Sequence, residues 1–367
     1  MTERNTTVLT LDAGGTNLVF SAFRNFKEII EPITLPANAH DYDKCIGAII
    51  SGFEQVAEKV GTYEVISFAF PGPADYDLGI IGNLPNFNAF RKPVPLGPIL
   101  KHHFNVPVLI NNDGNLFALG VARAGFLPAL NQRLRDAGSS KQFQNLVGIT
   151  LGTGFGCGIV ANGELVRGDN SCGAEIHNTL NATNPNWNAE ESISTRAIQR
   201  VYAEYANIPF DAQLMPRDIY EIATGRGAGN VQAAQESFLQ FGKALGASIV
   251  NVLTLIDGVV VIGGGLSKNW DVFAPAMFNE VNRQIEDFKG TAHSRLSFKV
   301  YNLEDPTVFD EFAKGNPESI VVPRSGETIQ YDSMQRTGIA LCNIDSSFAT
   351  SLGAYALALE KLQNNLV

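Results

Sequence analysis

Leu11-Asp12-Ala13-Gly14-Gly15-Thr16-Asn17 is the stretch that decides the fold of this 367-residue chain. A β-rich run over 6–11 leads into it, and residues 18–23 form a second apolar strand after it. Two strands joined by a Gly-Gly corner predict a hairpin whose tip lies near a ligand. Backbone N–H groups at such a corner suit a phosphate, and the carboxylate of Asp12 suits Mg²⁺, directly or through water. Alone this is weak evidence, because Gly-Gly-Thr also forms ordinary hairpins.

The same pattern returns in the second half of the chain. Residues 146–151 and 155–160 read as strands on either side of Gly152-Thr153-Gly154. An internal duplication of one α/β unit is the simplest explanation. Two such corners could hold one polyphosphate from either side of a cleft.

The rest of the chain alternates strands and helices, which predicts α/β architecture in two related lobes. Apolar spacing predicts helices over 43–60, 116–124, 232–255 and 351–367, and strands over 65–70, 106–110 and 259–262. We expect a small lobe over 1–118, joined by the helix 351–367, and a large lobe over 119–350. The polar stretch 301–340 is interpreted as an extra hairpin or a surface excursion.

Composition excludes several classes of function. Lys and Arg number 27 against 37 Asp and Glu, a net charge of −10, which argues against nucleic acid or an anionic membrane as partner. A phosphate ligand stays possible, since backbone N–H groups and metal ions can hold it. The 4 cysteines form no CxxC pair, which indicates a reduced, cytoplasmic protein. We expect no signal peptide and no stretch apolar enough to span a bilayer.

Two further motifs carry candidate chemistry. Asn112-Asp113 follows an apolar strand and opens a helix, where α/β folds expose ligand-facing residues. A carboxylate there could accept a proton from a substrate hydroxyl, although Asp or Asn at such a junction also commonly caps the helix. Gly263-Gly264-Gly265 ends another strand and is either an adenine or ribose site or only a tight turn.

Together these motifs resemble those of the sugar kinase/actin/Hsp70 ATPase superfamily, and their order and spacing resemble the ROK family. Residues 11–17 resemble the first phosphate motif, 152–156 the second and 261–265 the adenosine motif. Other landmarks of that family are matched by 83–87, 112–115, 163–168 and 352–357. The resemblance covers nearly the whole chain apart from 301–340.

The resemblance implies two actin-like (ribonuclease H-like) ATPase lobes with mixed sheets around a central cleft, and transfer of the γ-phosphoryl group of ATP to a hexose hydroxyl. A glucokinase-like enzyme is expected, with N-acetylhexosamine kinase and fructokinase as alternatives. Asp113 would be the general base. Sugar ligands would be Gly72, Asn86, Asn112, Glu175, His177 and Glu190. ATP and Mg²⁺ would be held by Asp12, Gly14, Gly15, Thr16, Asn17, Gly152, Thr153, Gly154, Gly263, Gly264 and Gly265.

One segment departs from the pattern of the ROK family. That family's usual zinc site takes one His and three Cys, but Glu175-Ile176-His177-Asn178 and the run 181–188 supply no Cys. A tetrahedral structural site cannot close without those thiolates, so we predict no zinc. His177 is then either a sugar ligand or a loop histidine.

Two other classes of function remain to be weighed. ROK transcriptional repressors carry a DNA-binding module ahead of the kinase-like part, whereas the first phosphate motif begins here at residue 11, so we expect no such module. A non-catalytic sugar sensor would have no need of Asp12, Asp113 and both glycine corners. The resemblance also suggests a homodimer. The sequence does not identify the sugar or the hydroxyl phosphorylated.

Overall fold

The computed structural model describes residues 5–14, 16–72, 74–84 and 88–364. The chain divides into two compact units. The first comprises residues 1–125, 158–174 and 343–367, and the second comprises 126–157 and 175–342. Residues 158–174 therefore join the first unit, which the sequence pattern does not indicate.

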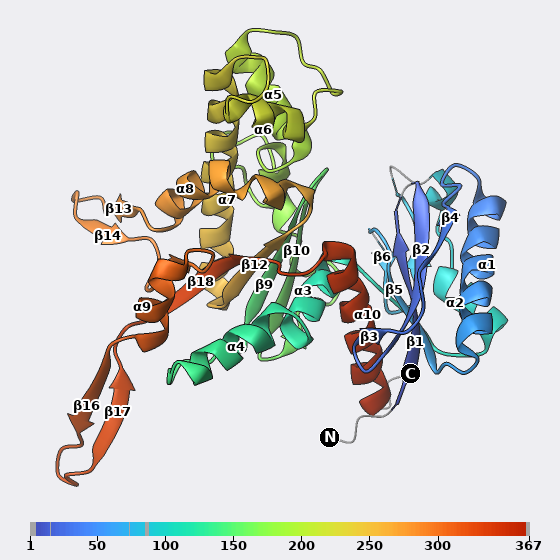
Figure 1. The fold of residues 1–367 in the computed structure, drawn as a ribbon, viewed down its shortest axis with the longest axis horizontal. Coiled ribbons are helices and arrows are strands. Elements are labelled where there is room, and N and C mark those ends of the chain that lie inside the picture. The colour runs from blue at the N-terminus through green and yellow to red at the C-terminus, as the bar shows by residue number, and fades with distance from the viewer. Residues whose placement is uncertain (1–4, 15, 73, 85–87, 365–367) are drawn as a thin grey trace. The chain divides into compact units, whose positions relative to one another are not determined.

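The first unit is built on a six-stranded mixed sheet of order β3-β2-β1-β5-β8, with β4 paired to β2 (Figure 1). β1 is antiparallel to β2 and parallel to β5, which is parallel to β8. The strands are β1 (Thr7–Ala13), β2 (Asn17–Arg24), β3 (Lys27–Glu28), β4 (Ile33–Pro36), β5 (Val65–Ala69) and β8 (Val108–Asn111). A short hairpin is formed by β6 (Ala74–Asp75) and β7 (Ile80–Ile81).

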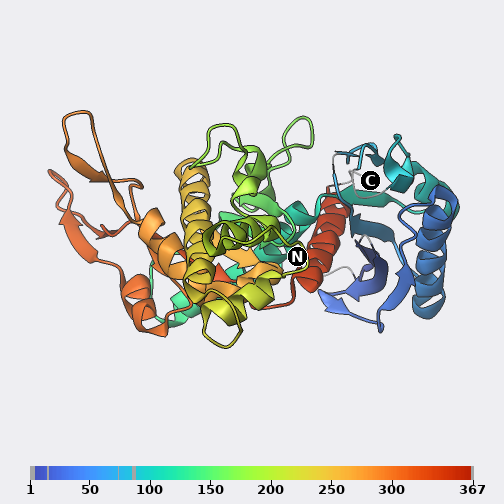
Figure 2. The ribbon, with the colours of Figure 1, turned by 90° about the horizontal axis from the view of Figure 1, so that it is seen from above.

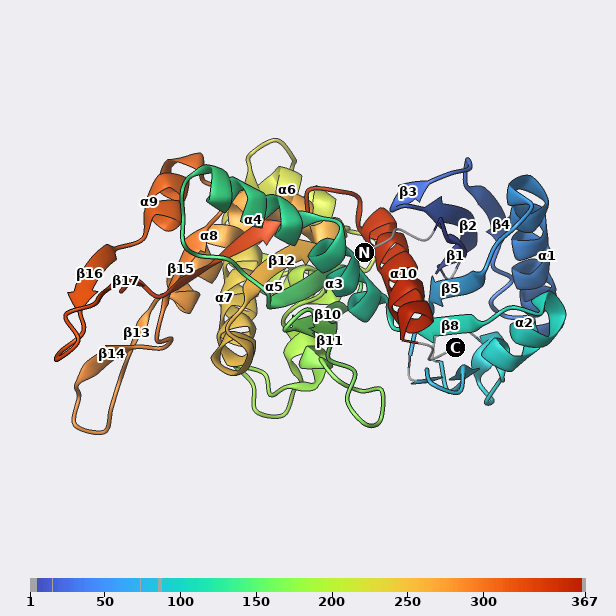
Figure 3. The ribbon, with the colours of Figure 1, turned by 90° about the horizontal axis from the view of Figure 1, so that it is seen from below.

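Helices cover both faces of this sheet. α1 (Tyr42–Val60) and α2 (Leu96–Phe104) lie on one face, and α10 (Ser346–Gln363) lies on the other with α3 (Asp113–Arg123) packed against it (Figure 3). Gly353 permits the close approach, because a Cβ there would clash with the carbonyl of Leu116. The buried hydroxyl of Tyr355 on α10 accepts the N–H of Asn25 at 2.9 Å. The C-terminal helix predicted over 351–367 is thus confirmed as far as residue 363, starts earlier than predicted, and completes the first core, while 365–367 lie outside the described residues.

The second unit is built on a six-stranded sheet of order β11-β10-β9-β12-β18-β15, and the division between the units falls within β10. β9 and β18 flank β12 in parallel, and β15 is parallel to β18. The strands are β9 (Leu146–Leu151), β10 (Phe155–Ala161), β11 (Glu164–Leu165), β12 (Val259–Gly263), β15 (Lys299–Asn302) and β18 (Arg336–Leu341).

The two sheets repeat one strand order. Each begins with three consecutive strands in reverse order, β3-β2-β1 and β11-β10-β9, and continues with strands parallel to the last of these. The corner between β1 and β2 and the corner between β9 and β10 therefore occupy equivalent places in their sheets. This repetition is the one that the duplicated hairpin pattern in the sequence predicts.

The helices of the second unit pack around α7 (Val231–Ile256), which contacts α5 (Thr195–Ala206), α6 (Pro216–Ala223) and α8 (Trp270–Val281). By length and composition alone α7 could cross a membrane, so the expectation that no stretch could do so is wrong. Most of its apolar window is buried, as in the core helix of a soluble protein. α4 (Phe126–Asp136) and α9 (Phe309–Lys314) complete the set of α-helices in the described part of this unit.

Two hairpins extend from one end of the second unit (Figure 2). They are β13 (Gln284–Glu286) with β14 (Ala292–Ser294), and β16 (Pro317–Val321) with β17 (Thr328–Asp332). The second confirms the extra hairpin expected within 301–340. The ends of that stretch, however, belong to β15 and β18 in the main sheet.

Candidate functional site

The first unit places Asp12 near the end of β1 and Thr16 and Asn17 at the following corner. The N–H of Gly14 donates to the carbonyl of Asn17 at 3.0 Å, which closes the turn. Asp12 is half-buried, and its carboxylate makes no ion pair or hydrogen bond with a described residue. Gly15 lies outside the described residues. The corner therefore presents a carboxylate and a hydroxyl on a closed backbone turn.

At the junction of β8 and α3, the side chain of Asn112 caps the helix and the next residue, Asp113, presents an exposed carboxylate. Asn112 is the N-cap of α3, and its Oδ1 accepts the N–H of Gly114 at 2.8 Å. Asp113 is the first helical residue and is exposed, and its Oδ1 also accepts the Gly114 N–H, at 2.9 Å. Asn111 is buried beneath them and accepts from Nδ2 of Asn115 at 3.0 Å. The carboxylate of Asp113 thus stands on a rigid, hydrogen-bonded turn.

Gly72 lies beyond β5, next to Tyr76. A Cβ on Gly72 would lie 2.9 Å from the Tyr76 hydroxyl, which itself donates to the carbonyl of Phe70 at 3.0 Å. Only glycine leaves that hydroxyl in place without a shift. Asn86, the other predicted sugar ligand in this part of the chain, lies outside the described residues.

The second unit holds the other glycine corner, and residues from another segment fix it on both sides. The carbonyl of Gly152 accepts the N–H of Thr195 at 2.9 Å and its hydroxyl at 3.0 Å. The N–H of Phe155 donates to Oε2 of Glu190 at 3.0 Å. The N–H groups of Thr153 and Gly154 have no acceptor among the described residues. They are the donors that the corner can offer to an anion.

Glu175 and His177 form a pair just beyond the corner in sequence. Nδ1 of His177 lies 2.9 Å from Oε2 of Glu175. That hydrogen bond and the charges of Glu175 and Glu190 raise the pKa of His177, against the opposing effect of its partial burial. Burial, and then the charge of Glu175, raise the pKa of Cys157 to about 12. The Cys157 thiol is therefore protonated at neutral pH and is no candidate nucleophile.

Both oxygens of Glu190 have partners. While Oε2 accepts from Phe155, Oε1 lies 3.0 Å from Nη2 of Arg196. Arg196 also binds Glu191 through two nitrogens, at 2.7 and 3.2 Å, and this pairing lowers the pKa of Glu191. The predicted sugar ligand Glu190 is thus also a structural support of the glycine corner.

The segment that lacks the usual zinc ligands of the ROK family is organised by Asn181, which is buried. Its Nδ2 donates to the carbonyl of Asn188 at 2.9 Å and to the hydroxyl of Ser192 at 2.8 Å. Its Oδ1 accepts the N–H of Thr183 at 3.0 Å and that of Asn184 at 3.1 Å. Within the described ranges, no three His, Cys, Asp or Glu side chains gather as metal ligands. One amide therefore orders this loop.

The triple-glycine turn ends β12 beside the corner at 152–154. Gly263 pairs with Thr150 of β9, and Gly264 has a φ of +86°. A Cβ on Gly264 would clash with the carbonyl of Leu151, whereas one on Gly265 would meet open space. The turn thus needs glycine at 264 for backbone reasons and leaves bare backbone at 265 for a ligand to approach.

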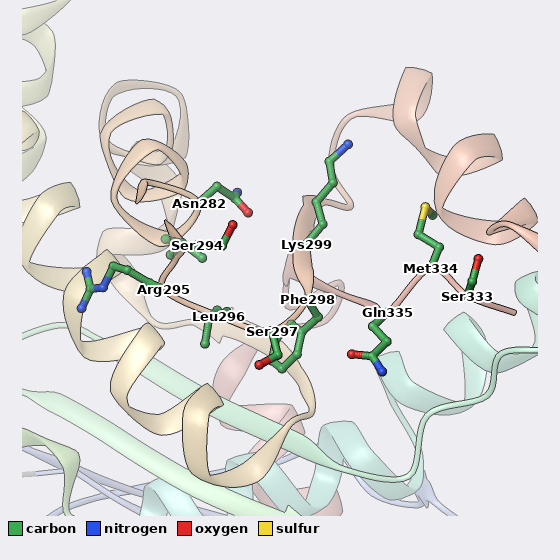
Figure 4. A pocket seen from close by; sticks show the side chains of 11 residues that line it. Asn282, Ser294, Arg295, Leu296, Ser297, Phe298, Lys299, Ser333, Met334 and Gln335 are labelled. Atoms are coloured by element: carbon green, nitrogen blue, oxygen red, sulfur yellow. The ribbon is translucent and has the colours of Figure 1, made fainter. Parts of the chain in front are cut away.

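One cavity of the second unit lies away from these residues. It encloses about 690 Å³ and is lined by residues 281–282, 294–299 and 333–335, with Lys299 and Gln335 among them (Figure 4). None of the predicted site residues lines it. The roles of Asn181, Thr195 and Arg196 are not evident from the sequence, because no short motif marks these residues and their roles depend on contacts across the loop.

Comparisons with known proteins agree with this arrangement. Residues 8–306 match the family model described as ROK family. Over 70% of the chain and 83% of the relative, the sequence is 27% identical to an N-acetyl-D-glucosamine kinase of Photobacterium profundum. Over 71% of the chain and 81% of the relative, it is 27% identical to a glucokinase of Halalkalibacterium halodurans. The crystal structure of a glucokinase from Parabacteroides distasonis matches with a TM-score of 0.88 and 44% identity, covering 98% of this chain and 99% of that one.

Proposed function

We propose that this chain, which belongs to the ROK family and has its actin-like ATPase fold, is an ATP-dependent sugar kinase of the glucokinase type. The observation that carries the proposal is the β8–α3 junction. Asn112 supplies the helix cap, so the exposed carboxylate of Asp113 is not needed for that role. A carboxylate so placed suits a general base.

In the proposed reaction the oxygen of a sugar hydroxyl attacks the γ-phosphorus of ATP. Asp113 accepts the proton of that hydroxyl. The bond from the γ-phosphorus to the β,γ-bridging oxygen breaks, and ADP leaves with the electron pair. Gly72, Asn112, Glu175, His177 and Glu190 would orient the sugar. The backbone groups at 152–154 would hold phosphate, and the turn at 263–265 would hold the adenosine.

The family implies Mg²⁺ together with ATP, and Asp12 fits that requirement. Mg²⁺ keeps several waters and takes one or two protein carboxylates, and Asp12 offers one that no described residue engages. When bound, the ion would neutralise charge that develops on the phosphates. Thr16 and Asn17 would be the neighbouring polar contacts.

The substrate within the hexose class is the second question. The relatives include a glucokinase and an N-acetyl-D-glucosamine kinase at equal identity, which makes N-acetylglucosamine the second candidate. Sugar-dependent ADP release with glucose, N-acetylglucosamine, N-acetylmannosamine and fructose tests both. We expect the highest kcat/KM with glucose. Binding of a sugar without ADP release would instead support a sugar sensor.

We also propose a cytoplasmic homodimer. All 4 cysteines are described and none forms a disulfide, as expected of a protein from a reducing compartment. Light scattering that gives a monomer at micromolar concentration would contradict the dimer.

A further inference from the structure

The starting observation is that one short segment holds the glycine corner at 152–154 from both sides. Thr195 donates twice to the carbonyl of Gly152, and Glu190 accepts the N–H of Phe155. Between them, Ile193 and Ser194 are fully buried and anchor the segment. A displacement of Glu190 is therefore transmitted directly to the backbone of the corner.

Arg196 fixes the position of Glu190. Its guanidinium donates one hydrogen bond to Oε1 of Glu190, at 3.0 Å, and two hydrogen bonds to the carboxylate of Glu191. The Arg196 side chain is 45% exposed and that of Glu190 is 22% exposed. The pair can therefore respond to a ligand, and truncating Arg196 leaves no cavity in a core.

Gly154 provides independent evidence that the contact is close. A Cβ at this position would lie 2.7 Å from Oε2 of Glu190. The nearest obstacle is the end of a flexible side chain, and the φ of Gly154 is not in the left-handed region. Alanine at 154 would consequently push the carboxylate of Glu190 aside and leave the backbone conformation attainable.

We propose that Arg196 is a positioning residue that couples sugar binding at Glu190 to nucleotide binding at the Gly152–Gly154 corner. The inference rests on the proposed kinase function. A carboxylate has room for more than two hydrogen bonds, so a sugar hydroxyl can donate to Glu190 while Arg196 and Phe155 remain bound. Sugar then holds the corner in the conformation that receives phosphate. Without Arg196, the carboxylate is free to turn toward the sugar and leave Phe155.

The test measures coupling as a ratio of dissociation constants. The Kd of the non-hydrolysable analogue AMPPNP with Mg²⁺ is determined by calorimetry with and without the sugar that gives the highest turnover. We expect the wild-type protein to bind the analogue about tenfold more tightly with sugar, within the usual range of such couplings. The same factor must appear when sugar is titrated with and without the analogue.

Three variants make the test specific. In Arg196→Ala and in Gly154→Ala the ratio should fall below about twofold, because each releases Glu190 from Phe155. Arg226→Ala is the matched control. Arg226 donates two hydrogen bonds to the carboxylate of Glu221, at 2.7 and 3.2 Å, as Arg196 does to Glu191, and neither Arg226 nor Glu221 belongs to the corner. Its ratio should equal that of the wild type.

The outcomes separate the two proposals. If the wild-type enzyme phosphorylates a sugar but Arg196→Ala keeps the full ratio, the coupling role is overturned and the kinase function stands. A wild-type ratio of one has the same consequence. If no sugar in the panel gives ADP release, the proposed function itself fails, and the coupling fails with it.

Discussion

Asn112 is the N-cap of α3 and accepts the N–H groups of Gly114 and Asn115, whereas Asp113, the first helical residue, shares only the N–H of Gly114. From the sequence, either residue could serve, since Asn and Asp cap about equally well. The structure assigns the cap to Asn112 and leaves Asp113 at the first helical position. The two side chains can therefore be tested separately.

Asp113→Asn should abolish most turnover and leave folding nearly unchanged. The substitution keeps the shape of the side chain but removes its basicity, which typically contributes ~10²–10⁴-fold in rate. The measurements are kcat for ADP release, sugar binding by calorimetry, and Tm. Asn112→Ala is the contrasting variant, and loss of the cap should cost about 0.5–2 kcal/mol of stability. Near-normal turnover in Asp113→Asn would contradict the role of base.

Asp12→Asn should raise the Mg²⁺ concentration that gives half-maximal turnover. Loss of a carboxylate that holds the ion directly or through water typically weakens affinity by about 10–100-fold. Turnover measured against Mg²⁺ concentration gives the shift, and excess chelator should stop the wild-type enzyme. Asp75→Asn, an exposed carboxylate of the same unit, serves as control. An unchanged Mg²⁺ requirement would remove Asp12 from the ion site.

The pH dependence of stability should carry the signature of His177. Its pKa is raised above the ordinary value of 6.5 by the hydrogen bond to Glu175. A raised pKa means that the folded state binds the proton more tightly than the unfolded state. This stabilisation is fully present below pH 6.5 and is lost as the pH rises through the raised pKa.

Tm measured between pH 5.5 and about pH 8.5 in wild type and Glu175→Gln tests this expectation. The stability advantage of the wild type should shrink as the pH rises, because the imidazolium that Glu175 stabilises is being lost. Glu204→Gln removes an exposed ion pair of α5 and should show no such change in this range. Parallel curves for wild type and Glu175→Gln would contradict the assignment.

Asn181→Ala should destabilise the loop that carries Glu190. The variant leaves two backbone N–H groups, those of Thr183 and Asn184, without their acceptor, and each such loss costs about 1–3 kcal/mol where the group stays buried. We expect a lower Tm and a higher KM for sugar. Asn181→Asp keeps the acceptor side of the network and should recover part of both. Unchanged values in Asn181→Ala would show that other contacts order the loop.

Purified protein should contain no stoichiometric zinc. The run 175–191 supplies no thiolate, and tetrahedral structural sites in proteins need a closed set of four ligands. Elemental analysis after extensive dialysis is the measurement, with the added Mg²⁺ as internal reference. One zinc per chain would mean that this segment binds metal through other donors.

The parts of the fold that depend on local pattern could be predicted. Strand, glycine corner and strand occur within about 18 residues at both 6–23 and 146–160, so both hairpins follow from sequence alone. The apolar runs of β5 and β12 and the amphipathic pattern of α1 predict these elements equally well. Residues 158–174 begin within β10, where the sequence pattern has no break, and only packing assigns them to the first unit.

The contacts of the candidate site were less predictable, because they join distant positions. Glu190 meets Phe155 across 35 residues, and nothing near either residue signals that bond. Asn181 lies in a run of polar residues that contains several asparagines, and the sequence alone does not distinguish their roles. Only its burial distinguishes it from Asn184 and Asn186. The roles of Glu190 and Asn181 could not be predicted because their partners lie at other positions of the chain, not because their chemistry is unusual.

The position of α10 constrains how the protein can fold during synthesis. The helix packs on β1 and β5, and Val8, Val65 and Tyr355 share one cluster of buried side chains. On the ribosome, β1 and β5 emerge long before residues 346–363 are made. One apolar face of the first sheet therefore stays uncovered by α10 until the whole second unit has been translated. The second unit, whose last residue is 342, can therefore fold before the core of the first unit is complete.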